Sequence, residues 1–479
     1  MKIKFLIKLF SVILITGLGT LTSCSDEETY TNSPNLSLVF SQDTLTFDTV
    51  FTDIGSSTQW LKVFNPNSDG VRISNIKLAS EGKSGFYINV DGQSGLSFDN
   101  VDIAHKDSVF VFVEVKVDPT DNDSPVLIED SIVFSFQNGV HQCVHLIAYG
   151  QDVIILDGIV VNNDTNLTSN RPYLIYDSLV VTEGCTLTLE EGTKLYFHSK
   201  TSLIVHGTLH SKGTLEKPVM MRGDRLDHMF DYLPYDRLDA QWGGVYISKT
   251  SNNNILDYTD IHSGSYGIYC DGTDEEQCKI TLTNSIIHNV AGSGLRLTCC
   301  KAYVANSQIS NAKSYCVDIL GGTSEFIHCT IAQFYPWKQY EAAVLFSNTR
   351  NDSIVDLHNV SFHNCYITGA QEDEIYGKKA GESEFSDALF NYHFENCVLA
   401  TVIDESDTNF ISCTLDTLEN HGDNFRMIDT ENYIYDFRLD SASVARSKSS
   451  EQYIDLYPND RSGIARQRGN IDAGCYQFQ

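Results

Sequence analysis

The stretch Asn284-Ser285-Ile286-Ile287-His288-Asn289 returns 22 residues later as Asn306-Ser307-Gln308-Ile309-Ser310-Asn311. A third copy, His328-Cys329-Thr330-Ile331-Ala332-Gln333, follows after a further 22 residues, and Asn359-Val360-Ser361-Phe362-His363-Asn364 continues the series after an insertion. A short repeat with one apolar strand per copy is typical of a solenoid, because each repeat can bury its inner face only against its neighbours. The repeat therefore predicts an all-β domain in which parallel strands stack into a β-helix.

Alternation along each copy predicts which side chains point into this solenoid. The apolar residues should form an internal stack: Ile261, Ile287, Ile309, Ile331 and Phe362. The residues two positions earlier should also point inward: Ser285, Ser307, Cys329, Val360, Cys397 and Cys413. We therefore interpret these cysteines as core filler. The amides that close the copies should form a ladder at one turn: Asn289, Asn311, Gln333 and Asn364.

Flanking stretches carry a resemblance to a known family. Glu183-Gly184-Cys185-Thr186-Leu187, Gln241-Trp242-Gly243-Gly244-Val245 and Asp472-Ala473-Gly474-Cys475-Tyr476 look like bacterial pectate-lyase-like lipoproteins. The resemblance implies a right-handed parallel β-helix solenoid over residues 153–440 and a β-helix-associated segment over 441–479. We expect no cofactor, with Ca²⁺ as the alternative if the protein is a lyase.

The first domain reads as short strands separated by turns. Residues 45–50, 60–64 and 109–117 alternate between apolar and polar side chains, as half-buried strands do. This pattern predicts an immunoglobulin-like sandwich over residues 36–152. Phe47-Asp48-Thr49-Val50, together with Val63-Phe64-Asn65-Pro66-Asn67, resembles the Hydin-type immunoglobulin-like modules of bacterial surface proteins, which usually act as spacers or binding modules.

The amino end predicts where the protein resides. Early lysines precede an apolar stretch that ends at Leu21-Thr22-Ser23-Cys24, and this arrangement resembles a bacterial lipoprotein signal peptide. The resemblance implies a signal peptide over residues 1–23, lipidation of Cys24 and an acidic tether over 24–35. Ser25-Asp26-Glu27-Glu28 resembles the surface-export signal of Bacteroidetes lipoproteins, with a plain polar tether as the alternative. We therefore expect an outer-membrane lipoprotein exposed at the cell surface.

Composition excludes several classes of function. The 479-residue chain carries 63 acidic against 33 basic side chains, a formal charge of -30, and such a surface repels nucleic acid. Hydrophobic residues make up 42% of the chain, which excludes general disorder. The partners we expect are the outer membrane, through the lipid anchor, and a polysaccharide or cell-surface partner.

Two cysteines suggest a cross-link between coils. Cys278 and Cys300 each lie six residues before a repeat copy, so they should occupy the same position in adjacent coils. Neighbouring strands lie about 4.8 Å apart, which is within the span of a disulfide. We therefore predict a bridge between Cys278 and Cys300, with Cys299 or Cys270 as a competing partner.

One column of outward side chains is a candidate catalytic site. Tyr269, Arg296 and Asp318 fall at one position of successive coils. A polysaccharide lyase needs a base and a cation, and this column could supply both. The alternative is a surface Arg–Asp pair beneath a tyrosine.

A second outward column carries histidines. His262, His288 and His363 share one position of the repeat, but the two copies between the last two carry Ser310 and Ala332. A metal would need converging imidazoles, and the column is interrupted. We therefore predict no metal site and interpret these histidines as solvated.

An aromatic insertion is the candidate ligand-binding segment. Tyr335, Trp337 and Tyr340 lie close together in the stretch that follows the third copy. Exposed aromatic faces can stack on sugar rings, and loops on a rigid scaffold commonly carry function. Capping of the hydrophobic core by these rings is the alternative.

These features favour a lipid-anchored surface protein that binds a glycan or another surface partner through the β-helix without catalysis. The alternative is a polysaccharide lyase or glycoside hydrolase acting on the β-helix flank, and a structural or adhesive role is the third reading. Phosphate-binding loops, nucleophile elbows and HExxH zinc motifs are absent from the sequence.

Overall fold

The computed structural model describes residues 29–31, 33, 35–272, 277–337, 339–351, 353–381, 387–403 and 407–479. Two compact units divide the chain: Met1–Asp118 with Leu127–Gly150, and Pro119–Val126 with Gln151–Gln479. The described residues form strands and two short 3-10 turns, without an α-helix. No helix among them has the length and apolar character to cross a membrane. Cys24 and the expected signal peptide lie outside the described residues.

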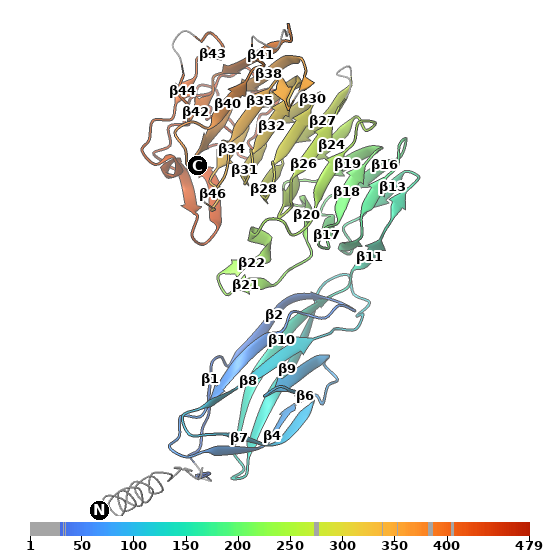
Figure 1. The fold of residues 1–479 in the computed structure, drawn as a ribbon, viewed down its shortest axis with the longest axis vertical. Coiled ribbons are helices and arrows are strands. Elements are labelled where there is room, and N and C mark those ends of the chain that lie inside the picture. The colour runs from blue at the N-terminus through green and yellow to red at the C-terminus, as the bar shows by residue number, and fades with distance from the viewer. Residues whose placement is uncertain are drawn as a thin grey trace, which may run out of the picture. The chain divides into compact units, whose positions relative to one another are not determined.

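Unit 1 is a sandwich of two five-stranded sheets, ordered β1-β3-β8-β5-β6 and β2-β10-β9-β4-β7 (Figure 1). The strands are β1 Val39–Phe40, β2 Thr44–Phe51, β3 Gln59–Phe64, β4 Val71–Leu78, β5 Phe86–Val90, β6 Gln93–Gly95, β7 Ser97–Ile103, β8 Ser108–Val115, β9 Val126–Phe136 and β10 His141–Gln151. The three alternating runs became β2, β3 and β8, so Phe47 is buried and Phe110 faces outward. The expected immunoglobulin-like sandwich is confirmed.

Unit 2 is a parallel β-helix whose coils add strands to three sheets (Figure 1). Sheet 1 contains β11 Ile154–Asp157, β14 Tyr173–Tyr176, β17 Lys194–Phe197, β20 Val219–Gly223, β25 Thr259–His262, β28 Ile286–Val290, β31 Gln308–Ala312, β34 Thr330–Gln333, β39 Tyr366–Gly369, β42 Val398–Leu399 and β44 Thr414–Leu415. Sheet 2 contains β12 Val160–Val161, β15 Leu179–Val181, β18 Ser202–Val205, β23 Gly244–Ile247, β26 Ile268–Asp271, β29 Leu295–Thr298, β32 Val317–Leu320, β35 Val344–Ser347 and β40 Ile375–Lys378. Sheet 3 contains β13 Thr165–Leu167, β16 Thr186–Leu189, β19 Thr208–Lys212, β24 Asn254–Asp257, β27 Cys278–Thr283, β30 Lys301–Ala305, β33 Gly322–Ile327, β38 Leu357–His363, β41 Phe390–Glu395 and β43 Phe410–Ile411.

The predicted isoleucine stack is confirmed in four coils. Ile261, Ile287, Ile309 and Ile331 are paired in register along sheet 1, and all are fully buried. The fifth member was wrong, because Ile331 pairs with Ile367. Phe362 lies in sheet 3, where it belongs to a second internal stack.

That second stack consists of phenylalanines. The rings of Phe326 and Phe362 have centroids 4.7 Å apart, and the Phe362 and Phe394 rings are 4.8 Å apart and within 3° of parallel. Phe410 extends the stack at 5.0 Å from Phe394. The rings of the first three are fully buried, so they fill the solenoid interior through its later coils.

The wrong placement of the copy that contains Phe362 has a simple cause. Each copy begins and ends with a polar turn residue, and Asn364 was aligned with the closing residue. The strand register places Asn364 with the opening residues Asn284, Asn306 and Asn396. The φ values of these four residues lie between 51° and 55°. Asparagine tolerates this left-handed backbone better than most residues do. The ladder at the closing turn therefore includes Asn289 and Asn311 but not Asn364.

Small residues form a hydrogen-bonded column beside these turns: Thr259, Ser285, Ser307, Cys329, Cys365, Cys397 and Cys413. Each hydroxyl or thiol donates to the carbonyl two residues earlier. Ser285 and Cys365 also accept the backbone N–H of the preceding coil, from Thr259 and Cys329. Cys365, not Val360 as predicted, occupies the column. The cysteines therefore serve the core, and burial raises the pKa of Cys365 well above its usual value.

The last coil ends at β44, earlier than the expected boundary at 440. Hairpin β45 Phe425–Asp429 and β46 Ile434–Leu439 follows, and its Phe425 and Phe437 pack with Phe334 and Tyr366 of the β-helix. The tail returns along the solenoid, where Tyr476 donates a 2.6 Å hydrogen bond to Gln308 of β31. An earlier insertion contributes the short strands β21 His228–Phe230 and β22 Leu233–Pro234. These three segments surround the site described next.

Candidate functional site

A cleft of about 540 Å³ lies over the outer face of sheet 1. Strands β25, β28 and β31 supply one wall, while the insertion, hairpin β45–β46 and the tail supply the others. The charged and titratable side chains that line the cleft include Asp260, His262, His288, Arg237, Arg438 and Arg461. The cleft therefore combines imidazoles with guanidinium groups in a chain that is acidic overall.

One carboxylate at the cleft is shared by two histidines. Asp260 and His262 both face outward on β25, and β28 places His288 in register with His262. Oδ1 of Asp260 lies 2.8 Å from Nδ1 of His262 and 3.3 Å from Nε2 of His288. The two imidazole rings stack with centroids 4.7 Å apart. His262 is only 7% exposed, so the expectation of solvated histidines was wrong for this residue.

The environment sets the charge of this cluster. Burial lowers the pKa of His262 despite the attraction of Asp260, so its imidazole is neutral at neutral pH. Burial would raise the pKa of Asp260, but electrostatic attraction and hydrogen bonds from His262 and His288 to the ionised carboxylate hold it well below its usual range. An ionised Asp260 therefore accepts a hydrogen bond from Nδ1 of a neutral His262.

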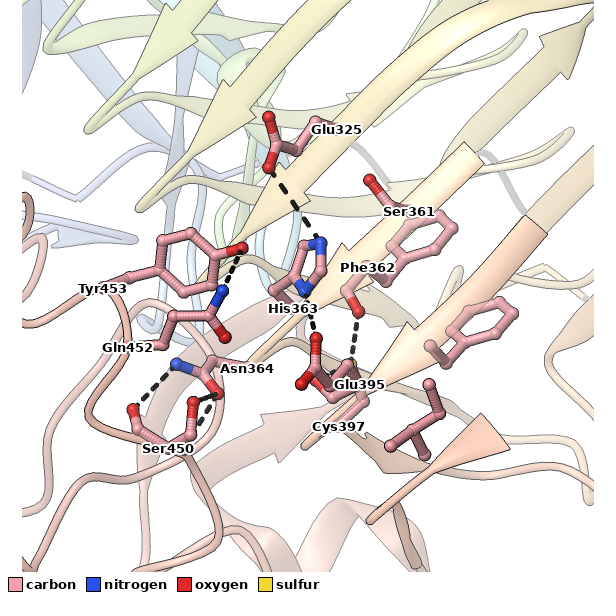
Figure 2. Close-up of polar contacts among 12 residues, drawn as sticks. Glu325, Ser361, Phe362, His363, Asn364, Glu395, Cys397, Ser450, Gln452 and Tyr453 are labelled. Carbon is pink, nitrogen blue, oxygen red and sulfur yellow. Dashed lines mark hydrogen bonds and ion pairs between the residues drawn. The ribbon is translucent and has the colours of Figure 1, made fainter. Parts of the chain in front are cut away.

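His363 does not join this pair, although the sequence placed it in the same column. It lies in sheet 3, where Nδ1 is 3.1 Å from Glu395 and Nε2 is 3.9 Å from Glu325 (Figure 2). The ring of Tyr453 lies 5.2 Å away and helps to cover it. This imidazole is only 7% exposed and bridges two coils of the solenoid, so the expectation of a solvated histidine was wrong here too.

Asp260 was not predicted as a site residue. The predicted column contained only histidines, whereas Asp260 and His262 are two apart on one strand and must share a face. That alternation, with His288 one coil later, was the available signal. The arginines could not be placed, since Arg438 and Arg461 return to sheet 1 from the hairpin and the tail.

The three arginines differ in the partners of their guanidinium groups. Arg438 pairs with Asp436 at 2.5 Å, and Arg237 donates a 3.1 Å hydrogen bond to the carbonyl of Asn432. Nε of Arg461 is buried and has no hydrogen-bond partner among the described residues. An unsatisfied donor on a cation is costly, and because Arg461 lines the cleft, an anion bound there could pair with its guanidinium group.

The predicted column of Tyr269, Arg296 and Asp318 exists in sheet 2, since the three residues are paired in successive strands. Its chemistry matches the structural alternative. Arg350 bonds to one oxygen of Asp318, Nε of Arg296 lies 3.8 Å from the other, and the Arg296 guanidinium lies 5.2 Å over the Tyr269 ring. Burial raises the pKa of Asp318, and the two arginines oppose that effect. We therefore regard this column as an ion-pair cluster.

The aromatic segment is divided between core and surface. Tyr335 is buried and its hydroxyl donates to Asp239, as the capping alternative has it. Tyr340 is half-buried, whereas Trp337 is 52% exposed. The Trp337 ring contacts Tyr433, 6.0 Å between centroids, and Tyr433 lines the cleft. Trp337 therefore borders the cleft and keeps its interpretation as a ligand contact.

The predicted disulfide is absent, because Cys278 and Cys300 are both free thiols. Its premise was also wrong, since a bulge in β27 places Cys278 opposite Lys301. The bulge turns Lys279 inward, where Nζ donates to the carbonyls of Ser248 and Lys249, each at 3.0 Å, and to that of Ser251. Residues from Ile280 onward keep the 22-residue spacing, whereas the bulge displaces Cys278 before them by one position, which strict counting does not anticipate.

A family model agrees with the fold of unit 2. Residues 157–335 match the family model described as a right handed beta helix region. A crystal structure of pectate lyase Pel9A is 11% identical, covering 68% of this chain and 88% of that one, with a TM-score of 0.28. A family 123 glycoside hydrolase from Clostridium perfringens is 9% identical over 26% of this chain, with a TM-score of 0.19, and the present chain spans about 30% of its length. No curated protein matches the chain.

The fold and the site together define a class. The chain is an all-β protein in which an immunoglobulin-like sandwich precedes a right-handed parallel β-helix. The β-helix carries a cleft lined by arginines and by a carboxylate that two histidines share.

Proposed function

We propose that this protein binds an anionic polysaccharide in the cleft over sheet 1. The observation that carries the proposal is the position of Arg461 in the cleft, since no described residue accepts a hydrogen bond from its Nε. Guanidinium groups hold carboxylate or sulfate groups through charge-assisted, often bidentate, hydrogen bonds. Arg237 and Arg438 line the same cleft and supply further donors.

The rim of the cleft suits a sugar ligand. Trp337 and Tyr433 present aromatic faces at one edge, and Phe230 and Tyr232 stack at 5.9 Å on the insertion, each more than half exposed. Aromatic rings contact the apolar faces of sugars, while arginines contact the charged groups. Both kinds of contact come from segments outside the coils: the insertions, hairpin β45–β46 and the tail.

The cellular setting is part of the proposal. A lipid on Cys24 would hold the protein in the outer membrane of a Bacteroidetes cell, facing outward. The sandwich of unit 1 would then act as a Hydin-type spacer. The sequence resemblances described above support this setting, and multiple acyl chains on one residue are sufficient for stable anchoring.

A second candidate is a polysaccharide lyase or glycoside hydrolase acting in the same cleft. The observation that favours it is the carboxylate of Asp260 beside His262, since an oriented histidine is the commonest general base. In a lyase, an arginine such as Arg461 would neutralise the uronate whose neighbouring proton is removed. The cleft thus replaces the sheet 2 column as the place to look for catalysis.

One experiment separates these functions. The mature protein is presented with polyuronates, sulfated glycans and neutral glycans, and binding is recorded together with the ultraviolet absorbance of unsaturated products. We expect saturable binding to an anionic glycan, weakened by salt, with no new absorbance. New absorbance would establish the lyase instead. Equal binding to neutral glycans, or no binding at all, would refute the proposal.

A further inference from the structure

We infer that Asp260, His262 and His288 form a binding site for a divalent transition-metal ion of the Zn²⁺ type. The inference goes beyond glycan binding and does not depend on it. One oxygen of Asp260 and one nitrogen of each histidine lie within 4.8 Å of one another. No other group of this kind occurs among the residues that the structure describes.

The spacing of these atoms fits a tetrahedral ion. Ligands about 2.0 to 2.1 Å from a tetrahedral zinc lie roughly 3.3 Å from one another. Oδ1 of Asp260 is 3.3 Å from Nε2 of His288 and 2.8 Å from Nδ1 of His262. The two imidazole nitrogens are at most 4.8 Å apart, so they would approach each other by up to about 1.5 Å when an ion enters. The proton on Nδ1 of His262 would move to Nε2, so the imidazole stays neutral.

The donor set also selects the kind of metal. Imidazole nitrogens favour zinc, copper, nickel and iron, whereas calcium and magnesium prefer oxygen ligands throughout. Three protein ligands leave the fourth position of the ion open, as in catalytic rather than structural zinc sites. Because all three residues line the cleft, this position would face it.

Neighbouring residues hold the cluster in place, and a nearby cation is paired with a carboxylate of its own. Trp242 is fully buried and its Nε1–H donates a 2.8 Å hydrogen bond to the carbonyl of His262. The charge of Arg222 acts on His262 and would oppose a metal, and its guanidinium group lies 3.4 Å from Asp236. Arg222 also donates a 2.7 Å hydrogen bond to the carbonyl of Arg225. An ion beside Arg461 would add positive charge to a cleft suited to anions.

Titration with metal alone tests the inference. The full-length mature protein, without an affinity tag and freed of metal by a chelator, is titrated with Zn²⁺ by calorimetry and with Co²⁺ by visible absorption. We expect one ion per chain and an intense Co²⁺ spectrum of low coordination number. His262→Ala and His288→Ala should each weaken binding by at least about tenfold to a hundredfold, as loss of a ligand or of its support does.

His198→Ala is the matched control, because Nδ1 of His198 lies 2.7 Å from Asp224 at a half-exposed position without a second imidazole. It should leave metal binding unchanged. Asp260→Asn, which keeps the shape of the side chain, provides a second variant should a histidine variant fail to fold. Absence of stoichiometric binding, or binding that survives all three cluster substitutions, would overturn the inference. Glycan is absent throughout, so failure of the proposed function would not affect this result.

Discussion

Replacing Phe362 by alanine lowers the free energy of unfolding of the β-helix by about 3 to 5 kcal/mol. The ring is fully buried between Phe326 at 4.7 Å and Phe394 at 4.8 Å. Its removal takes apolar surface out of the core and leaves a cavity that two stacked neighbours cannot close. Denaturant unfolding followed by circular dichroism measures the loss.

Phe230→Ala is the control, since the same side chain is 55% exposed on the insertion. Its unfolding free energy should change by less than about 0.5 kcal/mol. Equal effects of the two substitutions would show that the phenylalanine stack is not part of the solenoid core.

The contribution of Glu374 to the stability of the protein falls as pH rises between about 4.5 and about 8. Burial raises the pKa of this glutamate from 4.5 to about 8. The hydrogen bonds that it accepts from the backbone N–H groups of Gln371 and Ala343 act in the opposite direction and lower the pKa. In this window the folded protein keeps a proton that the unfolded chain releases. The stabilisation is complete below the unfolded pKa and is lost as pH passes the folded pKa, at about 1.4 kcal/mol per pH unit.

Unfolding of the protein and of Glu374→Gln across this pH range isolates that contribution. The difference in unfolding free energy between the two should change by a few kcal/mol across the window. Glu419→Gln, at an exposed position, should leave the pH dependence as it is in the unaltered protein. Parallel pH profiles for the protein and Glu374→Gln would contradict a buried, protonated Glu374.

Much of the fold follows from local pattern. The period of the repeat and strict alternation were sufficient to place Ile261, Ile287, Ile309 and Ile331 in one internal stack. They failed at Phe362, because each copy begins and ends with a similar polar turn residue and an insertion removed the regular spacing. They failed again at Cys278, because a β-bulge changes the face of the strand to which a side chain points. The sequence contains no clear signal of this bulge.

The candidate site was less predictable than the fold. Its histidines and Asp260 lie on adjacent strands, so strand alternation and the repeat could have predicted that part of the cleft. Its arginines come from segments far along the chain, and only packing of hairpin β45–β46 and the tail on sheet 1 brings Arg461 to His288. Contacts of such long sequence separation leave no periodic trace.

The most direct test of the account is the affinity of the mature protein for an anionic polysaccharide, compared with Arg461→Ala and Arg468→Ala. Arg461 has an unsatisfied buried Nε in the cleft, whereas Arg468 is exposed and pairs with Glu451 at 3.1 Å and with Asp455 at 2.6 Å. Loss of a charge-assisted hydrogen bond of about 1.5 to 3 kcal/mol corresponds to roughly a tenfold to hundredfold weaker Kd. The account predicts that loss for Arg461→Ala and less than about a twofold change for Arg468→Ala. Equal affinities of the protein and Arg461→Ala would contradict it.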